Sequence, residues 1–472
     1  MHLGRTILSA TLAVSLTACG GGGSGNAPGG STGGGGIGAS DCTLGARQDW
    51  VLSVLNEWYR FPNLLDTTVN KANHSSLQSY VNAVTQPSEQ LFGAGKTFTY
   101  ITSIAEENAL ISSGSSAGFG IRLSYDFASS RVYVIEAFEN APAFAQGIDR
   151  GTEIIAINGQ TTSSLLASGN ASAFLSALGP SDAGVTRSLT IRQPGGAQST
   201  VSVTKAEYSL DPMSDTYGAK ILDNGGTKVG YINLRTFIVD DASSQLRTAI
   251  GQFKAQGVNQ VILDLRYNGG GLVSVANTLG DLLGANHVGQ LFSNTTYRST
   301  KSSNDVRRVF GAESQAIAAT KIAVIGTRAT ASASELVANA YIPYLNDNIA
   351  LVGGDTYGKP VGQNAFDRSA CDDRLRAVTF KTDNAAGGGD YYSGLASVMP
   401  VTCAAGDDIF TPLGDPSEDS ISVALDYLAG RSCTAISKAG AGTTAQETAG
   451  TRRMLGVPDR PSAAQLQIPG LF

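Results

Sequence analysis

Histidine is scarce in this sequence: only His2, His74 and His287 occur among 472 residues. A hydrolase that pairs a serine with a histidine base would have to draw that base from these three. The HExxH, paired CxxC and GxxxxGK[ST] patterns are also missing, so no motif for zinc or nucleotide binding is present. We therefore expect no metal and no cofactor, and an activated serine here needs another base.

Positive charge is not in excess either. The chain has 33 Lys and Arg against 39 Asp and Glu, a formal net charge of −6. This balance gives no indication of a nucleic-acid partner. After the N-terminal segment, no second apolar run of membrane-spanning length follows. The length is sufficient for two or three folded domains.

The N-terminus has the pattern of a signal peptide over residues 1–18. Arg5 precedes the apolar run "TILSATLAVSL", and a small-residue site ends at Ala18. The sequence Leu-Thr-Ala-Cys resembles a bacterial lipobox, which implies cleavage before Cys19 and lipidation (palmitate included) of that cysteine. The alternative is an ordinary secretory signal that is cleaved nearby. Gly20 after the cysteine, by analogy with lipoproteins, implies the outer membrane of a Gram-negative cell.

Residues 19–42 are expected to be a lipidated cysteine and a tether, since Gly, Ser and Pro dominate from residue 20 to residue 40. A flexible segment of this length spans roughly 25 Å root-mean-square. It would hold a folded body close to a membrane surface.

The remaining cysteines, Cys42, Cys371, Cys403 and Cys433, form an even set. In an oxidising compartment such a set favours two disulfides, for which three pairings are possible. We expect Cys371–Cys403, which are close in sequence, and Cys42–Cys433, which would join the ends of the folded body. Free buried thiols are the alternative.

Two N-terminal domains are predicted. Residues 43–110 have helical periodicity, with apolar residues from Trp50 to Trp58 on one face, and should form a small helical cap. Residues 115–207 contain short β-rich runs separated by turns. The sequence thus changes from a helical to a β-rich pattern near residue 115.

The β-rich segment resembles a PDZ domain. Gly118, Phe119, Gly120 and Ile121 stand where that family has its carboxylate-binding loop, and Ala141 to Gly159 is similar to its helix-and-strand element. Backbone N–H groups in a glycine-containing turn can hold an anion, and the next strand edge can pair with an extended peptide. The alternative is a module that no longer binds peptides and only positions the catalytic body.

A larger domain is expected over residues 208–435, followed by a C-terminal tail over 436–472. It contains two strand–loop–helix units, "QVILDLRYNGGGLVSVANTLGDLL" and "KIAVIGTRATASASELVANAYIPYL". Continuous apolar strands that alternate with helices predict an α/β sheet covered on both faces. Such folds place their chemistry in loops after the carboxyl ends of strands.

Three separate blocks carry a resemblance to one family. "DLRYNGGG" (Asp264 to Gly271), "TASASE" (Thr330 to Glu335) and "GDTYGKPVGQ" (Gly354 to Gln363) are similar to the signature blocks of the C-terminal processing, or tail-specific, serine peptidases. The resemblance covers roughly residues 45–430. It implies an α/β (α+β multidomain) protein in which a helical cap and a PDZ-like domain accompany a Clp protease/crotonase-like ββα catalytic core.

The resemblance also assigns roles to residues. It implies a Ser–Lys dyad with Ser332 as nucleophile and Lys359 as base, and Gln363 orients the lysine. A lysine at its usual pKa of about 10.4 is protonated, so a base near neutrality needs a pKa lowered by roughly 3 units. Burial among apolar residues, as around Lys359, can lower it. The alternative for this lysine is a solvated surface charge.

The residues around Ser332 support the same role independently. Ser332 lies between an apolar strand and a helix that should begin near Ser334, where helix N–H groups can face an oxyanion. Ser334 suits an N-cap or first-turn position, and Glu335 complements the positive helix end. Capping alone is the alternative explanation for a serine in this turn.

Backbone N–H groups should form the oxyanion hole. One is that of Ala333, next to the nucleophile, and alignment of the glycine loop on the family pattern implies Gly270 for the other. A plain strand-to-helix turn that uses glycine for unusual φ is the alternative for this loop.

The sequence therefore indicates a lipid-anchored serine endopeptidase of the bacterial cell envelope. Its partners would be polypeptides that are unfolded or have accessible C-termini, gathered by the PDZ-like domain, and the membrane. The competing hypothesis is a lipoprotein that binds peptides or serves as a scaffold on the same fold without turnover.

Overall fold

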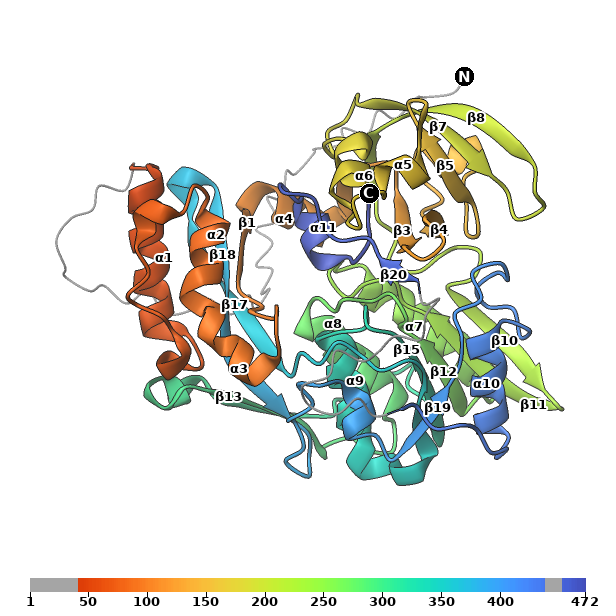
Figure 1. The fold of residues 1–472 in the computed structure, drawn as a ribbon. Helices are drawn as coiled ribbons and strands as arrows, with labels where there is room; N and C mark the ends of the chain where they lie inside the picture. Colours follow the sequence, from red (N-terminus) through yellow and green to blue (C-terminus); the bar gives the residue numbers. More distant parts are fainter. Residues whose placement is uncertain (1–40, 438–451) are drawn as a thin grey trace, which may run out of the picture. The chain divides into compact units, whose positions relative to one another are not determined.

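The protein is described from a computed structural model, which places residues 41–437 and 452–472 (Figure 1). The expected signal peptide, Cys19 and nearly all of the expected tether lie outside the described residues. The chain folds as a mixed α/β protein, as the sequence predicts.

The central sheet has six strands in the order β10-β11-β12-β15-β16-β19. Strands β11 to β19 pair in parallel, and β10 is an antiparallel edge strand. The bounds are β10 Ala219–Asn224, β11 Thr227–Asn233, β12 Gln260–Asp264, β15 Lys321–Gly326, β16 Ile349–Gly353 and β19 Val401–Ala404. Strands of this kind are apolar throughout because both faces of the sheet are covered.

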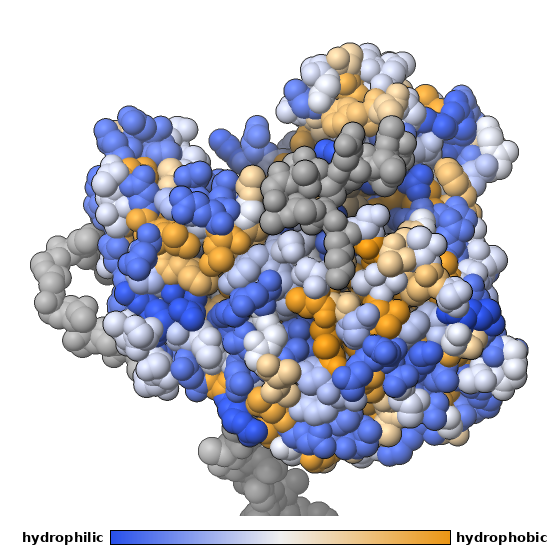
Figure 2. Space-filling model, turned by 60° about the horizontal axis from the view of Figure 1, so that its bottom comes forward, coloured by the Kyte–Doolittle hydropathy of each residue, from blue (hydrophilic) through white to orange (hydrophobic). Residues whose placement is uncertain are grey.

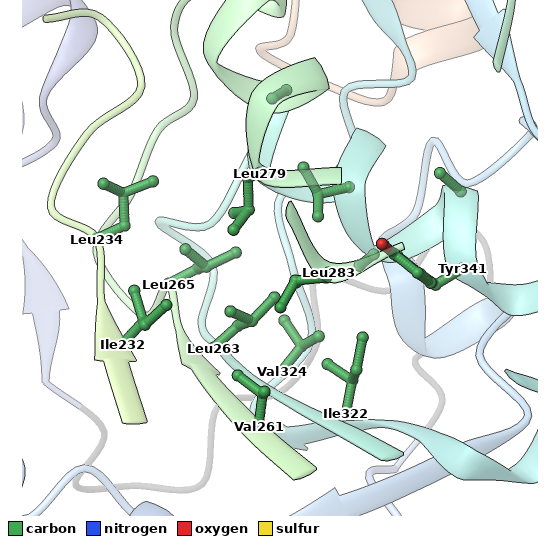
Figure 3. Packing of buried hydrophobic residues seen from close by; sticks show 14 of the residues in the cluster. Ile232, Leu234, Val261, Leu263, Leu265, Leu279, Leu283, Ile322, Val324 and Tyr341 are labelled. Carbon is green, nitrogen blue, oxygen red and sulfur yellow. The ribbon is translucent and has the colours of Figure 1, made fainter. Parts of the chain in front are cut away.

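Helices cover each face of this sheet. On one face a large apolar cluster joins the strands to α7 (Ala242–Ala255), α8 (Val273–Leu283) and α9 (Ala333–Leu345). Figure 3 shows leucine, isoleucine and valine side chains of the strands meeting those of α8 and α9. A second cluster packs α10 (Asp419–Leu428) on the opposite face. The central sheet is thus buried on both sides, as expected.

The N-terminal helices pack on a second sheet of five strands. Its order is β1-β18-β13-β14, with β17 also paired to β18. The helices are α1 (Leu44–Trp58), α2 (Leu77–Thr85), α3 (Glu89–Phe92) and α4 (Ile104–Ser113). The strands are β1 (Tyr100–Ser103), β13 (Leu291–Tyr297), β14 (Val306–Val309), β17 (Val361–Arg368) and β18 (Asp373–Asp383). Strands from the predicted catalytic segment therefore complete the core of the predicted cap.

Residues 115–209 form mainly antiparallel β-structure. The strands are β2 (Ser115–Gly118), β3 (Ile121–Asp126), β4 (Arg131–Ala137), β5 (Glu153–Ile157), β6 (Gln160–Thr161), β7 (Thr186–Arg192), β8 (Gln198–Thr204) and β9 (Ala206–Ser209). Two short helices, α5 (Thr162–Leu165) and α6 (Ser172–Leu178), accompany them. Strands β3, β4, β5, β7 and β8 are neighbours in one sheet, which encloses its own apolar cluster.

The last described segment, residues 452–472, returns to this β-rich sheet. It contains β20 (Arg453–Met454), which pairs with β3, and α11 (Ala463–Gln467). Leu471 and Phe472 are both 3% exposed. A C-terminal tail was expected here, and its described part is packed into the protein.

The expected disulfide pairing is wrong. Cys42 pairs with Cys371 and Cys403 pairs with Cys433, with Cα–Cα distances of 5.5 and 5.3 Å. Cys42 lies just before α1, and α1 packs near the start of β18, where Arg47 binds Asp373.

The second pair follows from the path of the chain after α10. That segment runs along β19, where the Ala404 N–H donates to the carbonyl of Thr434. Cys403 thus pairs with Cys433, 30 residues later, and not with Cys371, which precedes it by 32 residues.

The surface in Figure 2 is mainly hydrophilic, with apolar residues in several separate areas of that face. Among the residues that the structure describes, none of the helices combines the length and apolar character that a membrane span requires.

Candidate active site

The three sequence blocks follow three adjacent parallel strands. The glycine block comes after β12, the serine block after β15 and the lysine block after β16. Carboxyl ends of parallel neighbours meet at one edge of the sheet, so the three loops are brought together there.

Ser332 has an unusual backbone conformation. It lies directly before α9 with φ 56° and ψ −113°. A residue other than glycine in this region costs about 1–3 kcal/mol, and such strain concentrates at functional sites. The helix begins at Ala333, so Ser332 is the N-cap position and Ser334 belongs to the first turn.

Ser334 is engaged elsewhere. Its hydroxyl is buried and donates to the carbonyl of Asn268 at 3.0 Å. That carbonyl also accepts the Ala331 N–H at 3.1 Å. Ser334 therefore fastens the serine loop to the glycine loop, while the Ser332 side chain remains partly accessible.

The carboxylate of Glu335 connects the serine block to the lysine block. Glu335 is fully buried, and its Oε2 accepts the backbone N–H groups of Ser332 at 2.9 Å and Lys359 at 2.8 Å. Its Oε1 accepts the Gly358 N–H at 2.7 Å and the Thr356 hydroxyl at 2.6 Å. Burial raises the pKa of Glu335 against the effect of these four bonds.

Lys359 has the environment of a weakened base. Its Nζ donates to Gln363 Oε1 at 2.9 Å and lies 5.5 Å from the centroid of the Phe98 ring. Burial of the amine lowers its pKa to about 8, an effect that Glu335 opposes and Arg376 adds to. Gln363 in turn donates to the carbonyl of Phe98, which holds the amide in this orientation.

The hydroxyl of Ser332 and the amine of Lys359 are not hydrogen-bonded to each other in the described chain. The two residues share the Glu335 carboxylate through their backbones, and Lys359 Nζ is bonded to Gln363. Catalytic hydrogen bonds are often long before substrate binds.

Gly270 lies against Ser332. A Cβ at Gly270 would stand 2.8 Å from Cβ of Ser332 and 3.0 Å from the nitrogen of Ala333, and φ is 103°. Glycine is therefore required there for close approach. The Gly270 N–H donates to Asn268 Oδ1 at 2.9 Å. Ala333 N–H is at the helix start and has no hydrogen-bond partner within the described ranges.

The loop Gly118, Phe119, Gly120 and Ile121 lies at the start of β3, apart from the serine and lysine loops in the sequence. Gly118 and Gly120 have φ values of 157° and 74°. This loop holds Phe472 of the same chain, which the sequence did not indicate.

Sequence reasoning missed three contributors to the site. Glu335 was assigned only to the helix end, Phe98 comes from the N-terminal segment, and Asn268 joins two loops through its buried backbone and side chain. Asn268 and Glu335 stand in the DLRYNGGG and TASASE blocks and were visible as parts of a pattern, whereas Phe98 lies outside all three blocks. In the described part of the chain, no cluster of three or more potential metal-ligating His, Cys, Asp or Glu side chains occurs.

Part of the chain is similar to known proteins. Residues 228–388 match the model of Peptidase family S41. A carboxyl-terminal-processing protease of Picosynechococcus sp. is 31% identical over 258 residues, which cover 54% of this chain and 57% of that protein. A chloroplastic C-terminal processing peptidase of Tetradesmus obliquus is 30% identical over 275 residues, 54% of each chain. The matched segment thus spans little more than half of these relatives.

A solved structure shows the same fold. A putative S41 protease from Bacteroides fragilis NCTC 9343 superimposes with a TM-score of 0.62 over 81% of this chain and 97% of that chain, at 23% sequence identity.

Proposed function

We propose that the chain is a serine endopeptidase of peptidase family S41, whose model matches residues 228–388, and that it works with a Ser332–Lys359 dyad. The observation that carries the proposal is the shared carboxylate of Glu335, which fixes the backbones of both residues. The lowered pKa of Lys359 supports its role as base.

Acylation would begin with attack of Ser332 Oγ on the carbonyl carbon of a peptide bond. The lone pair of neutral Lys359 Nζ takes the hydroxyl proton, while an N–H of the same amine donates to Gln363 Oε1. The C–N bond then breaks, and the Lys359 ammonium returns the proton to the leaving amine. An acyl ester on Ser332 remains.

Deacylation uses the same groups in reverse order. Water attacks the ester carbon and gives a proton to Lys359 Nζ. The ester bond breaks, the peptide leaves as a carboxylic acid, and Ser332 regains its proton. The dyad is then restored.

The oxyanion of each tetrahedral intermediate would be stabilised by the N–H of Ala333 and by that of Gly270. The Ala333 donor is free, while the Gly270 donor must exchange Asn268 Oδ1 for the oxyanion. A Cβ at Gly270 would stand 2.8 Å from Cβ of Ser332, so the backbone of Gly270 lies close to the proposed nucleophile.

Degradation of an unfolded protein by purified full-length chain tests this function. We expect cleavage by wild type, none by Ser332→Ala, and retained cleavage by His74→Ala and His287→Ala. If a histidine variant is inactive while Lys359→Arg remains active, the Ser–Lys assignment is wrong and a Ser–His pair is supported instead. If wild type binds the unfolded protein without cutting it, the non-catalytic scaffold is correct.

The cell envelope is the proposed location. Relatives of this chain include bacterial and chloroplast processing proteases, and the N-terminal lipobox pattern supports a membrane anchor at Cys19. Cys19→Ala should release the protein from the membrane fraction or stall its processing, since the lipid would supply the affinity. Unchanged fractionation with membranes would contradict the anchor.

Substrates are proposed to be polypeptides that are unfolded or have accessible C-termini. The GFGI loop and the edge of β3 offer the backbone groups that an extended chain requires. This recruitment is the basis of the next inference.

A further inference from the structure

The final residues of the sequence pair with β3 as an added strand segment. Phe472 N–H donates to the carbonyl of Ile121 at 2.9 Å, and the Leu123 N–H donates to the carbonyl of Gly470 at 2.8 Å. Leu471 stands opposite Arg122 in antiparallel register. An extended peptide binds a free sheet edge in this way.

The GFGI loop closes around the same residue. Backbone O of Phe472 accepts two N–H groups, from Gly120 at 2.8 Å and from Ile121 at 3.2 Å. A Cβ at Gly118 would lie 3.0 Å from the carbonyl carbon of Phe472. Convergent amides of this kind form an anion-binding nest.

The Phe472 side chain is buried with the sheet core. It is 3% exposed and belongs to the cluster that includes Phe119, Leu123, Phe174 and Leu178. In Figure 1 the end of the chain, marked C, is drawn near β3 and α6. The hydrogen bonds to β3 use only backbone groups and do not depend on the side chain. The apolar cluster around Phe472 is therefore what distinguishes one side chain from another.

We propose that residues 470–472 are an internal ligand of the GFGI loop and the β3 edge, and that a polypeptide end with a bulky apolar last side chain must displace them to bind. The inference rests on the proposed recruitment of substrate at this loop. A charged last side chain would be excluded, because its burial would leave the charge unpaired.

The residues just before the internal ligand touch the glycine loop of the proposed active site. A Cβ at Gly269 would lie 2.8 Å from the carbonyl oxygen of Gln467 and 2.9 Å from Pro469 Cδ. The buried Arg122 Nη1 donates to the carbonyl of Tyr267 at 2.7 Å and to that of Pro469 at 3.1 Å. Occupancy of the β3 edge is thereby linked to the loop that carries Gly270.

Competition for the β3 edge can be measured without peptidase activity. The probe is a fluorescein-labelled peptide with the sequence of residues 463–472, titrated into full-length Ser332→Ala protein by fluorescence anisotropy. Adding Phe472→Asp should tighten binding at least ~10-fold, because the internal competitor is weakened. Val457→Asp is the matched control, since Val457 is 49% exposed in the same C-terminal segment.

Hydrogen exchange gives a second readout of the same event. The amides of Gly120, Ile121 and Leu123 should be protected in the Ser332→Ala parent, exposed with Phe472→Asp and protected again by the probe. Amides of β7 should stay slow throughout and report an intact sheet. If Phe472→Asp unfolds that sheet, Phe472→Ala replaces it under the same criteria.

Equal probe affinity in the parent and the Phe472 variant, or protected Gly120 and Ile121 amides in that variant, would overturn the internal ligand. Neither result depends on turnover. A failure of the Ser332–Lys359 assignment would leave both measurements intact, so the two proposals fail separately.

Discussion

The backbone N–H of Lys359 donates to Oε2 of Glu335 at 2.8 Å, across 24 positions of sequence. The same oxygen accepts the N–H of Ser332 at 2.9 Å. A single buried carboxylate thus sets the spacing between the proposed nucleophile and the proposed base. No hydrogen bond or ion pair joins the Glu335 carboxylate to the Lys359 amine in the described residues, so we infer that Glu335 acts by positioning.

Glu335→Gln should lower kcat by at least ~10-fold and destabilise the protein. The amide presents donors to groups that are themselves donors, and each lost hydrogen bond to a charged acceptor costs about 1.5–3 kcal/mol. Activity assays and thermal unfolding measure both effects. Glu57→Gln, which removes only an exposed pair with Lys301, is the control and should change neither quantity noticeably. An active, stable Glu335→Gln variant would contradict the positioning role.

Activity of the wild type should rise with pH, reach half of its maximum near pH 8 and level off about one unit higher. The pKa of Lys359 is lowered to about 8 by burial, and only the neutral amine can accept the serine proton. At pH 7 about a tenth of the molecules would carry the neutral form. The pH dependence of kcat/KM checks this, and a profile that falls with pH over this range would exclude the lysine as base.

Lys359→Arg and Lys359→Met should each reduce acylation by about 10²–10⁴-fold, since neither side chain offers a neutral amine. Lys254→Arg, on an exposed face of α7, should leave the rate unchanged.

The pH dependence of stability gives a second measurement of the Lys359 pKa. The folded protein releases the Lys359 proton near pH 8 and the unfolded chain near 10.5, so the unfolding free energy should rise over that window. Lys359→Met should remove this rise.

Gln363→Glu should move the activity profile to higher pH by at least ~1 unit. A carboxylate at the acceptor position of Lys359 Nζ, now 2.9 Å away, favours the ammonium form and raises the pKa of the lysine. Gln363→Ala should lower the rate without that upward displacement. If both variants keep the wild-type profile, Gln363 does not act on the amine.

Replacing Cys42 and Cys371 together by serine should destabilise the protein by about 2–4 kcal/mol, because the crosslink restricts the unfolded chain. The serine pair at Cys403 and Cys433 is the matched comparison. The Cys403–Cys433 disulfide spans a sequence separation of 30 residues, against 329 for Cys42–Cys371, so its loss should lower the free energy of unfolding by less. Chemical denaturation of both variants measures the difference, and equal losses would show that loop length is not the cause.

Short local patterns were enough to locate the central residues of the proposed site. Ser332, Lys359 and Gln363 each belong to a block of ten residues or fewer, and the blocks follow strands whose parallel pairing could be expected from their apolar runs. The helix start was also expected within one residue. Ser334, expected at the N-cap or in the first turn, lies in the first turn, and Ser332 is the N-cap residue.

Long-range contacts could not be predicted in this way. Glu335 is explicable as a helix-end acid until Gly358 and Lys359 are brought beside it by β16. The disulfide pairing failed for the same reason, since the path of the chain after α10 decides it. Nothing in the sequence of the final segment indicates that the backbone of Phe472 is bound by the GFGI loop.

The Cys42–Cys371 bond gives the folded body a defined point of mechanical attachment. A pull on the chain ahead of residue 41 would pass at Cys42 through the disulfide to Cys371. Residue 371 stands between β17 and β18, which are paired from Val361 to Arg368. The force would thus act on the pairing of β17, which has eight residues, with β18. It would not pass through the 15 residues of α1. Under tension the helical cap would keep its fold, and the loop that carries Lys359 would be strained only through its sheet.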